Sequence, residues 1–189
     1  MKPTTPVPNI MSRKDIKLII DENIDKPEDL LFLYSKGWAK RAGIIPYVIY
    51  AGKYHLLLGE QADTKGVPRL TDFGGGCEEQ EFPLECAMRE FKEETRRSFH
   101  INLNNTTHII VNKKDGHRQV ILFVRLAGFG SGNQNPIDEF RATFHNGIEY
   151  PPEMNEIQAI KWIAGDNIKI IDQKKLSRSI QSLLEYLFF

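Results

Sequence analysis

The sequence of 189 residues lacks a long apolar run and is poor in cysteine. No segment approaches the roughly 20 consecutive apolar residues that a membrane helix needs, and the N-terminal stretch MKPTTPVPNIMS has no apolar signal-peptide core. The two cysteines, Cys77 and Cys86, have neither the Cys-x-x-Cys nor the Cys/His spacing of a zinc site. We therefore predict two free thiols rather than a disulfide, in a protein that does not span a membrane and resides in the cytoplasm.

An excess of charge of either sign is also absent. Lys and Arg together number 25, as do Asp and Glu, so the formal net charge is zero. No overall field therefore attracts nucleic acid or an anionic membrane, and RNA binding would need a local basic patch. The apolar fraction of 41% and the charged fraction of 26% are typical of a globular protein.

The chain divides into three predicted parts. Residues 1–12 contain three prolines and are predicted to be a flexible N-terminal tail. Residues 13–36 are predicted to be an N-terminal helical extension, because Asp25 can cap a helix, Pro27 suits its first turn and Gly37 can end it. Residues 37–189 are then the main domain.

Within the main domain, hairpins alternate with helices. Residues 43–59 predict two strands that turn at Gly52-Lys53, with Pro46 indicating an edge or a bulge. Residues 107–128 predict a second hairpin that turns at Asp115-Gly116, and residues 157–164 predict a further strand. A final helix is predicted from about Asp172, and the long connection 128–152 is typical of a binding or lid element. This order favours a mixed sheet with helices packed on it.

The segment AMREFKEETRR, residues 87–97, has the pattern of a helix with three acids on one face. Glu90, Glu93 and Glu94 stand at i, i+3 and i+4. Like charges at this spacing cost roughly 0.2–0.5 kcal/mol per pair, and the helix dipole disfavours acids near the C-terminal end. The alternative is a solvated face on which Glu93 pairs with Arg89 or Arg97.

A wider window, residues 75–97, resembles the Nudix box, G-x5-E-x7-R-E-U-x-E-E-x-G-U, in which U is apolar. All six fixed glycine and charged positions up to the second acid of the Glu-Glu pair match: Gly75, Glu81, Arg89, Glu90, Glu93 and Glu94. At background frequencies, a match of this kind arises by chance about once in 10⁷ windows. Two positions depart from the pattern, since Arg96 stands in place of the glycine and Arg97 in place of the apolar residue. Without the glycine, we expect the helix to run on a little or to end by another cap.

The resemblance implies an α/β fold, the Nudix α/β/α sandwich with a mixed sheet between helices. It implies that Glu90, Glu93 and Glu94 hold Mg²⁺ or Mn²⁺, helped by the Gly74 carbonyl. Arg89 would orient the carboxylates, Glu81 would brace the loop before the helix, and Gly74 and Gly75 would let the backbone approach metal and phosphate. Hard cations of this kind take oxygen ligands, which the acidic helix face provides.

Other residues are weaker candidates. Family members often place a further acid before the last strand, here Glu153 or Glu156, so the general base is Glu90, Glu153 or Glu156; Glu156 stands nearer the strand. Basic and aromatic residues could meet phosphate, RNA or a base, although solvated turns and packed cores are the commoner settings of such residues. These are His117 and Arg118; Lys174, Lys175 and Arg178; and Tyr47, Tyr50, Tyr54 and Phe73.

The resemblance implies a metal-dependent pyrophosphohydrolase that cleaves the diphosphate linkage of a nucleoside diphosphate joined to another group. One alternative is hydrolysis of capped mRNA, suggested by the basic segments and by a faint likeness to the Nudix proteins of large DNA viruses. Another is a catalytically inert Nudix fold that binds nucleotides, although such proteins commonly lose box glutamates. Many family members are homodimers, an assembly that no feature of this sequence demands.

Overall fold

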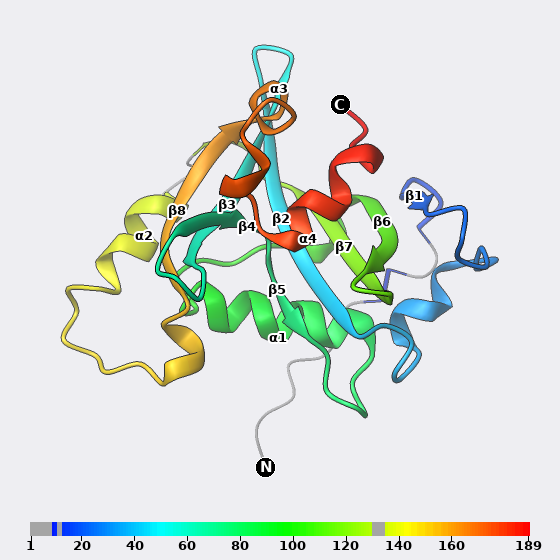
Figure 1. The fold of residues 1–189 in the computed structure, drawn as a ribbon, viewed down its shortest axis with the longest axis horizontal. Helices are drawn as coiled ribbons and strands as arrows, with labels where there is room; N and C mark the ends of the chain where they lie inside the picture. The colour runs from blue at the N-terminus through cyan, green and yellow to red at the C-terminus, as the bar shows by residue number, and fades with distance from the viewer. Residues whose placement is uncertain (1–8, 11–12, 130–134) are drawn as a thin grey trace.

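The computed structural model describes residues 9–10, 13–129 and 135–189 (Figure 1). Most of the predicted tail, residues 1–8 and 11–12, lies outside the described residues, as do residues 130–134 of the predicted lid loop. The described part of the tail is not detached from the domain. Ile10 is fully buried, and its backbone N–H donates to the hydroxyl of Tyr34 at 2.8 Å.

One mixed sheet forms the centre of the molecule. Its main order is β1-β6-β7-β2-β3-β4, while β5 pairs with β2 and β8 pairs with β3. The pairs β1/β6 and β2/β7 are parallel and the others are antiparallel. The strands are β1 Lys17–Ile20, β2 Arg41–Tyr50, β3 Lys53–Ala62, β4 Pro68–Thr71, β5 Phe73–Gly76, β6 Thr106–Lys114, β7 His117–Arg125 and β8 Ile157–Ala164.

Helices cover both faces of this sheet, with α1 on one face and α4 on the other (Figure 1). The α-helices are α1 Pro83–Glu94, α2 Pro136–Ala142, α3 Gly165–Ile168 and α4 Arg178–Leu183. Short 3₁₀ helices are η1 Leu30–Tyr34, η2 Leu103–Asn105, η3 Pro152–Met154, η4 Gln173–Lys175 and η5 Leu184–Tyr186. The predicted α/β sandwich with a mixed sheet is confirmed.

Alternation along the strands produces two apolar cores. In β2, Ile44 packs into the core beneath α1, whereas Ile45 packs into the core beneath α4. Successive side chains of a strand point to opposite faces, so a strand with helices on both sides is apolar at nearly every position. Buried Leu84, Ala87 and Phe91 form the apolar side of α1.

Both predicted hairpins are present. The second turns at Asp115-Gly116 as predicted, with φ of 51° and 78°. The first turns at Ala51-Gly52, one residue earlier than predicted, with φ of 50° and 75°. Two consecutive residues with positive φ match the right-handed twist of the strands that they join.

Three sequence predictions were wrong. The extension 13–36 is not purely helical, because β1 adds a parallel strand beside β6, although η1 begins after the cap Asp29. Pro46 lies neither at an edge nor in a bulge: it occupies the central strand β2, between the residues that pair with β5 and those that pair with β3. The last helix is divided into η4, α4 and η5. Ser177 separates η4 from α4, because it is extended and caps α4 by accepting the N–H of Ile180.

No helix among the described residues is long and apolar enough to cross a membrane.

Candidate metal and diphosphate site

The acidic face of α1 packs against the glycine strand β5. Glu94 is 3% exposed, and its carboxylate accepts the backbone N–H of Gly74 at 2.7 Å. A Cβ on Gly75 would lie 2.4 Å from Oε2 of Glu90, and a Cβ on Gly74 would lie 2.5 Å from Cα of Gly43. The backbone of Gly43 therefore leaves no room for a side chain at Gly74, whereas a side chain at Gly75 would displace the Glu90 carboxylate.

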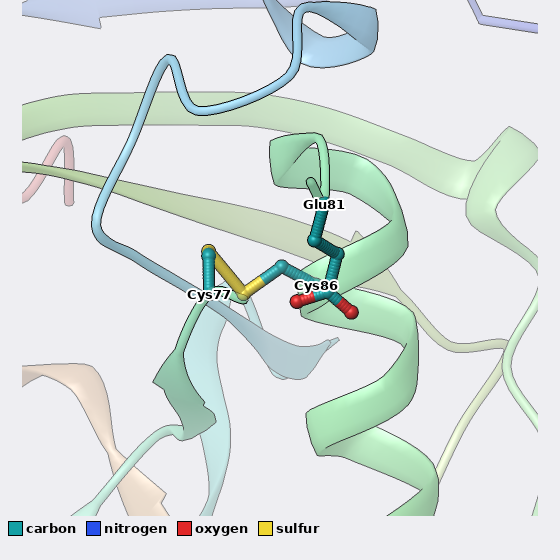
Figure 2. A group of neighbouring side chains, drawn as sticks. All are labelled: Cys77, Glu81 and Cys86. Carbon is teal, nitrogen blue, oxygen red and sulfur yellow. A yellow bond between two sulfur atoms is a disulfide. The ribbon is translucent and has the colours of Figure 1, made fainter. Parts of the chain in front are cut away.

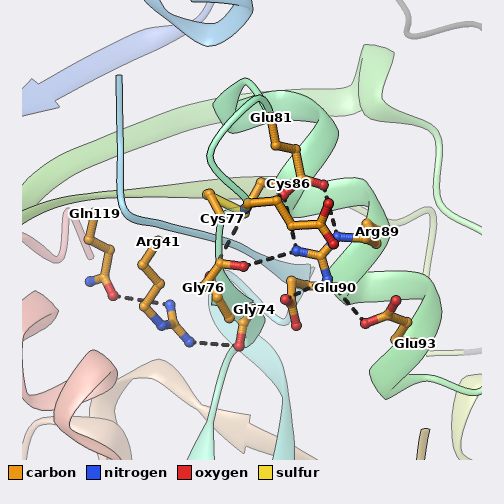
Figure 3. Close-up of a disulfide and its surroundings, with 12 residues drawn as sticks. Arg41, Gly74, Gly76, Cys77, Glu81, Cys86, Arg89, Glu90, Glu93 and Gln119 are labelled. Carbon is orange, nitrogen blue, oxygen red and sulfur yellow. Dashed lines mark hydrogen bonds and ion pairs between the residues drawn. A yellow bond between two sulfur atoms is a disulfide. The ribbon is translucent and has the colours of Figure 1, made fainter. Parts of the chain in front are cut away.

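Arg89 joins the box residues to one another (Figure 3). Its Nε and Nη2 donate to the two carboxylate oxygens of Glu81 at 2.8 and 3.1 Å. Its Nη1 donates to Glu90 at 2.8 Å and to Glu93 at 3.2 Å, and Nη2 also reaches the carbonyl of Gly76 at 2.9 Å. The i,i+4 pairing of Glu93 with Arg89 that the sequence offered as an alternative thus coexists with the contacts implied by the box.

Burial and like charges disfavour ionisation of two of the acids. Burial raises the pKa of the Glu94 carboxyl well above its ordinary value; the charges of Asp72 and Glu90 act in the same direction, while Arg41 and the Gly74 N–H oppose them. Burial likewise raises the pKa of Glu90, with Glu93 and Glu156 adding to the rise and Arg89 opposing it. A cation at this face would reverse the effect.

A buried ion pair on the other side of β5 was not found from the sequence. Arg41, the first residue of β2, donates to both carboxylate oxygens of Asp72 at 2.8 and 3.0 Å. It also donates to the carbonyl of Gly74 at 2.9 Å, the carbonyl that the box implies as a metal ligand. The pair spans 31 residues of sequence. An acid two residues before the first glycine of the run is the sequence signal that could have pointed to it.

The prediction of two free thiols was wrong. Cys77, directly after β5, and Cys86, in α1, form a disulfide with Cα atoms 5.2 Å apart (Figures 2 and 3). The loop between them returns the chain so that the start of α1 packs beside the end of β5, which spacing alone does not reveal. Together with Glu81 they are the one group within the described residues whose three ligand atoms lie within 4.8 Å. The sulfurs are bonded to each other and Glu81 is bound to Arg89, so this group does not serve as a metal site.

The two candidate acids before β8 differ in position. Glu156 directly precedes β8 and accepts a hydrogen bond from Gln61 at 3.0 Å, and its charge contributes to the raised pKa of Glu90. Glu153 is exposed in η3, and the described part of the chain shows no hydrogen bond or ion pair from it to the box acids. The charge of Glu156 thus acts on Glu90, while η3, which contains Glu153, packs against α1.

The predicted aromatic stacking residues do not form one surface. Tyr47 and Phe73 are buried in the two cores. Tyr54 stacks on Phe189, with ring centroids 5.0 Å apart. Tyr50 is 62% exposed, so among the predicted aromatic residues it alone offers an open ring.

Basic candidates line an open cleft beyond β5. The cleft has a volume of about 390 Å³ and is lined by Lys40, Lys113, His117 and Arg118, with the Arg118 guanidinium 4.4 Å from the Trp38 ring centroid. A neighbouring hollow, about 250 Å³, shares Lys40, His117 and Arg118 and reaches Gly76. The second basic group is elsewhere: Lys174 and Lys175 lie in η4, and Arg178 begins α4.

The helix ends at the position that the box assigns to glycine. Arg96 and Arg97 have φ of 53° and 54°, the left-handed conformation. The Arg97 N–H donates to the carbonyl of Lys92 and the Arg96 N–H to that of Glu93, which is the Schellman pattern usually closed by glycine. The helix does not run on, and Arg96 takes the glycine's conformation.

A family model described as NUDIX domain matches residues 40–183. Among solved structures, the chain is similar to a C. elegans Ap4A hydrolase in a binary complex (20% identity; 78% of this chain and 96% of that chain covered; TM-score 0.43). It is also similar to the NUDIX domain of Shewanella oneidensis NrtR complexed with ADP ribose (13% identity; 77% of this chain and 82% of that chain covered; TM-score 0.42). A third similar structure is a NUDIX hydrolase from Nitrosomonas europaea (16% identity; 77% of this chain and 87% of that chain covered; TM-score 0.45). A comparison with curated proteins finds no match.

Proposed function

This chain belongs to the NUDIX family, a family of hydrolases that act on pyrophosphate bonds, and we propose that it is a Mg²⁺- or Mn²⁺-dependent enzyme that cleaves a nucleoside diphosphate linked to another group. One observation carries the proposal. Glu90 and Glu94 are packed on one helix face against Gly74 and Gly75, and burial and neighbouring acids raise the pKa of both carboxyls. Such an arrangement is unfavourable for the chain alone and favourable once a cation is bound.

The donor set fits a hard divalent ion. Glu90, Glu93 and Glu94 offer carboxylate oxygens, the ligand type that Mg²⁺ and Mn²⁺ prefer, and the Gly74 carbonyl lies at the same strand. When bound, the ion would neutralise charge on the substrate phosphates. Its ligands must move to meet it, because Glu90 and Glu93 are hydrogen-bonded to Arg89 and Glu94 to the Gly74 N–H.

The other roles fall to side chains around this face. Water attacks one phosphorus, the bridging P–O bond breaks with its electron pair going to the leaving phosphate, and a carboxylate takes the water's proton. Among Glu90, Glu153 and Glu156, we assign this proton to Glu156, since its charge acts on Glu90 and it is not itself on the helix. Arg89 holds Glu81, Glu90 and Glu93 in place through four hydrogen bonds, while a fifth goes to the Gly76 carbonyl.

The test is the Glu93→Gln variant, matched by Glu85→Gln on the same helix and outside the fixed box positions. Both enzymes are assayed with Mg²⁺ and Mn²⁺ against nucleotide sugars, dinucleoside polyphosphates, damaged nucleotides, inositol pyrophosphates and capped RNA. We expect Glu93→Gln to lower metal-dependent turnover by at least about 10²-fold with an unchanged melting temperature, and Glu85→Gln to match the wild type. Full activity of Glu93→Gln would refute the assignment. Nucleotide binding without turnover at either metal would favour the inert module.

Capped RNA is the second candidate substrate, favoured by the cleft of Lys40, Lys113, His117 and Arg118 near Gly76. These cations could follow the phosphates of a polynucleotide. If so, hydrolysis of capped RNA falls steeply with salt while that of a small nucleotide does not. Absence of cap release beside rapid cleavage of a small nucleotide would exclude it. A homodimer and a cytoplasmic location stay predictions.

A further inference from the structure

Arg96 ends α1 in a conformation that an arginine does not favour. Its φ is 53° and that of Arg97 is 54°, in the left-handed region where glycine has no steric penalty. The turn itself needs only the backbone bonds of the Schellman motif. An arginine at this position must therefore contribute through its side chain.

The Arg96 side chain points into protein rather than into solvent, and the residue is 8% exposed. Its Nε donates to the carbonyl of Met154 at 2.8 Å and its Nη2 to Oδ1 of Asn155 at 2.7 Å. The guanidinium carbon lies 3.8 Å from the ring centroid of Phe144 and 4.9 Å from that of Tyr150. A planar guanidinium can donate along its edges while its face rests on an aromatic ring, which an ammonium group cannot do.

All of these partners belong to one stretch, residues 143–155, which connects α2 to β8. Nη1 is also 3.4 Å from the hydroxyl of Thr143. No ion pair joins Arg96 to a carboxylate in the described parts of the chain, so its charge is balanced by oxygen dipoles and ring faces. Arg96 therefore joins the end of the acidic helix to the α2–β8 connection.

The next residue after this stretch is Glu156. Asn155, which Arg96 binds, is its immediate neighbour, and Glu156 is held on its other side by Gln61 of β3. The 3₁₀ helix η3 within this stretch packs against α1, and the charge of Glu156 acts on Glu90, about one turn before the end of α1. A shift of the connection would thus move Glu156 relative to the box acids.

We propose that Arg96 is a positioning residue that docks the α2–β8 connection on the end of α1 and so holds Glu156 beside the box carboxylates. The inference rests on the proposed function for the part that Glu156 plays. The box has glycine at this position, where it ends the helix. Arg96 ends the helix in the same way and also binds the α2–β8 connection through its side chain. Arg97 shares the conformation but is exposed, which makes it a matched control.

The first test is a double-mutant cycle of Arg96→Gly and Glu156→Gln, with Arg97→Gly as control, in which kcat and KM are measured. Glycine suits the left-handed turn, so Arg96→Gly removes the side-chain contacts without breaking the helix end. We expect Arg96→Gly to lower kcat by about 10²-fold, to cause no further loss in the Glu156→Gln protein, and to be partly rescued by Arg96→Lys. Arg97→Gly should keep the wild-type kcat. Additive losses, or a wild-type kcat for Arg96→Gly or Glu156→Gln, would overturn the inference.

The second test needs no turnover. Hydrogen exchange of the amides in 143–156 should become faster in Arg96→Gly than in the wild type or Arg97→Gly, with unchanged exchange in the middle of α1. Equal exchange in all three proteins would show that Arg96 does not dock the connection. If the wild type cleaves no diphosphate substrate, the proposed function fails by itself, and hydrogen exchange still decides whether Arg96 anchors this stretch.

Discussion

Reducing the Cys77–Cys86 disulfide should destabilise the protein measurably, although the bond closes a short loop. The cysteines are nine residues apart. In the chain-entropy description, freeing a loop of this length in the unfolded state costs about 2.6 kcal/mol of unfolding free energy at 25 °C. For a chain of this size, each kcal/mol corresponds to roughly 2–4 °C, so the melting temperature should fall by about 5–10 °C.

The assay compares thermal unfolding of the wild type with and without dithiothreitol, followed by tryptophan fluorescence. The Cys77→Ala/Cys86→Ala protein is the control: it should melt below the oxidised wild type and should not respond to reductant. The loop that the bond closes contains Glu81, the partner of Arg89, so reduction should also raise KM or lower kcat. The disulfide would be refuted if thiol titration of the unreduced, unfolded wild type found two free thiols. An unchanged melting temperature on reduction would refute its contribution to stability.

Two further predictions concern the acids. Gly75→Ala places a methyl group where Oε2 of Glu90 lies, 2.4 Å from the added carbon, and should lower kcat by about 10²-fold while circular dichroism shows a folded protein; wild-type kcat would contradict the packing. Because burial, and then Asp72 and Glu90, raise the pKa of Glu94 in the folded chain, the metal-free protein holds this proton more tightly than the unfolded chain. The stability that the folded chain gains from protonated Glu94 is fully present below the ordinary carboxyl pKa, and it is lost as pH rises through the raised pKa. Melting scans in EDTA should show this loss in the wild type and not in Glu94→Gln; parallel curves would contradict it.

Local patterns predicted the parts of the fold that depend on neighbours in sequence. Positive φ at Asp115 and Gly116 follows from a dipeptide that tolerates it. The start of α1 follows from Pro83 at its first turn. The family followed from the box, because residues on one helix face have a fixed spacing that can be read from sequence alone.

Features that depend on distant partners could not be predicted in this way. Strand β1 is four residues long and pairs with β6, from which it is separated by about half of the chain. The Arg41–Asp72 pair spans 31 residues, and no periodicity links its members. The disulfide was mispredicted because cysteine spacing carries no information on how a loop returns to a helix.

Arg96 was the informative departure from the pattern. Replacement of the box glycine indicated a different helix end, whereas the structure has the glycine's backbone conformation with an arginine in it. A rule that reads residue types as conformations fails where a side chain gains enough contacts to offset about 1 kcal/mol of backbone strain. The two hydrogen bonds and the ring contact of Arg96 are of that kind.

The acidic helix is held at both ends by residues that the box does not specify. The disulfide joins its first half to β5, and Arg96 joins its end to the α2–β8 connection. Between these points the acids repel one another at roughly 0.2–0.5 kcal/mol per pair. Glu94 is buried and Glu90 partly buried, and the cations that act on their pKa values are Arg41 and Arg89. Since repulsion of this kind tends to fray the last turn of a helix, attachment at both ends keeps the carboxylates together in the absence of the proposed metal. The Cys77→Ala/Cys86→Ala/Arg96→Gly protein lacks both attachments. Without metal, its α1 should lose helical order, and added Mg²⁺ should restore that order.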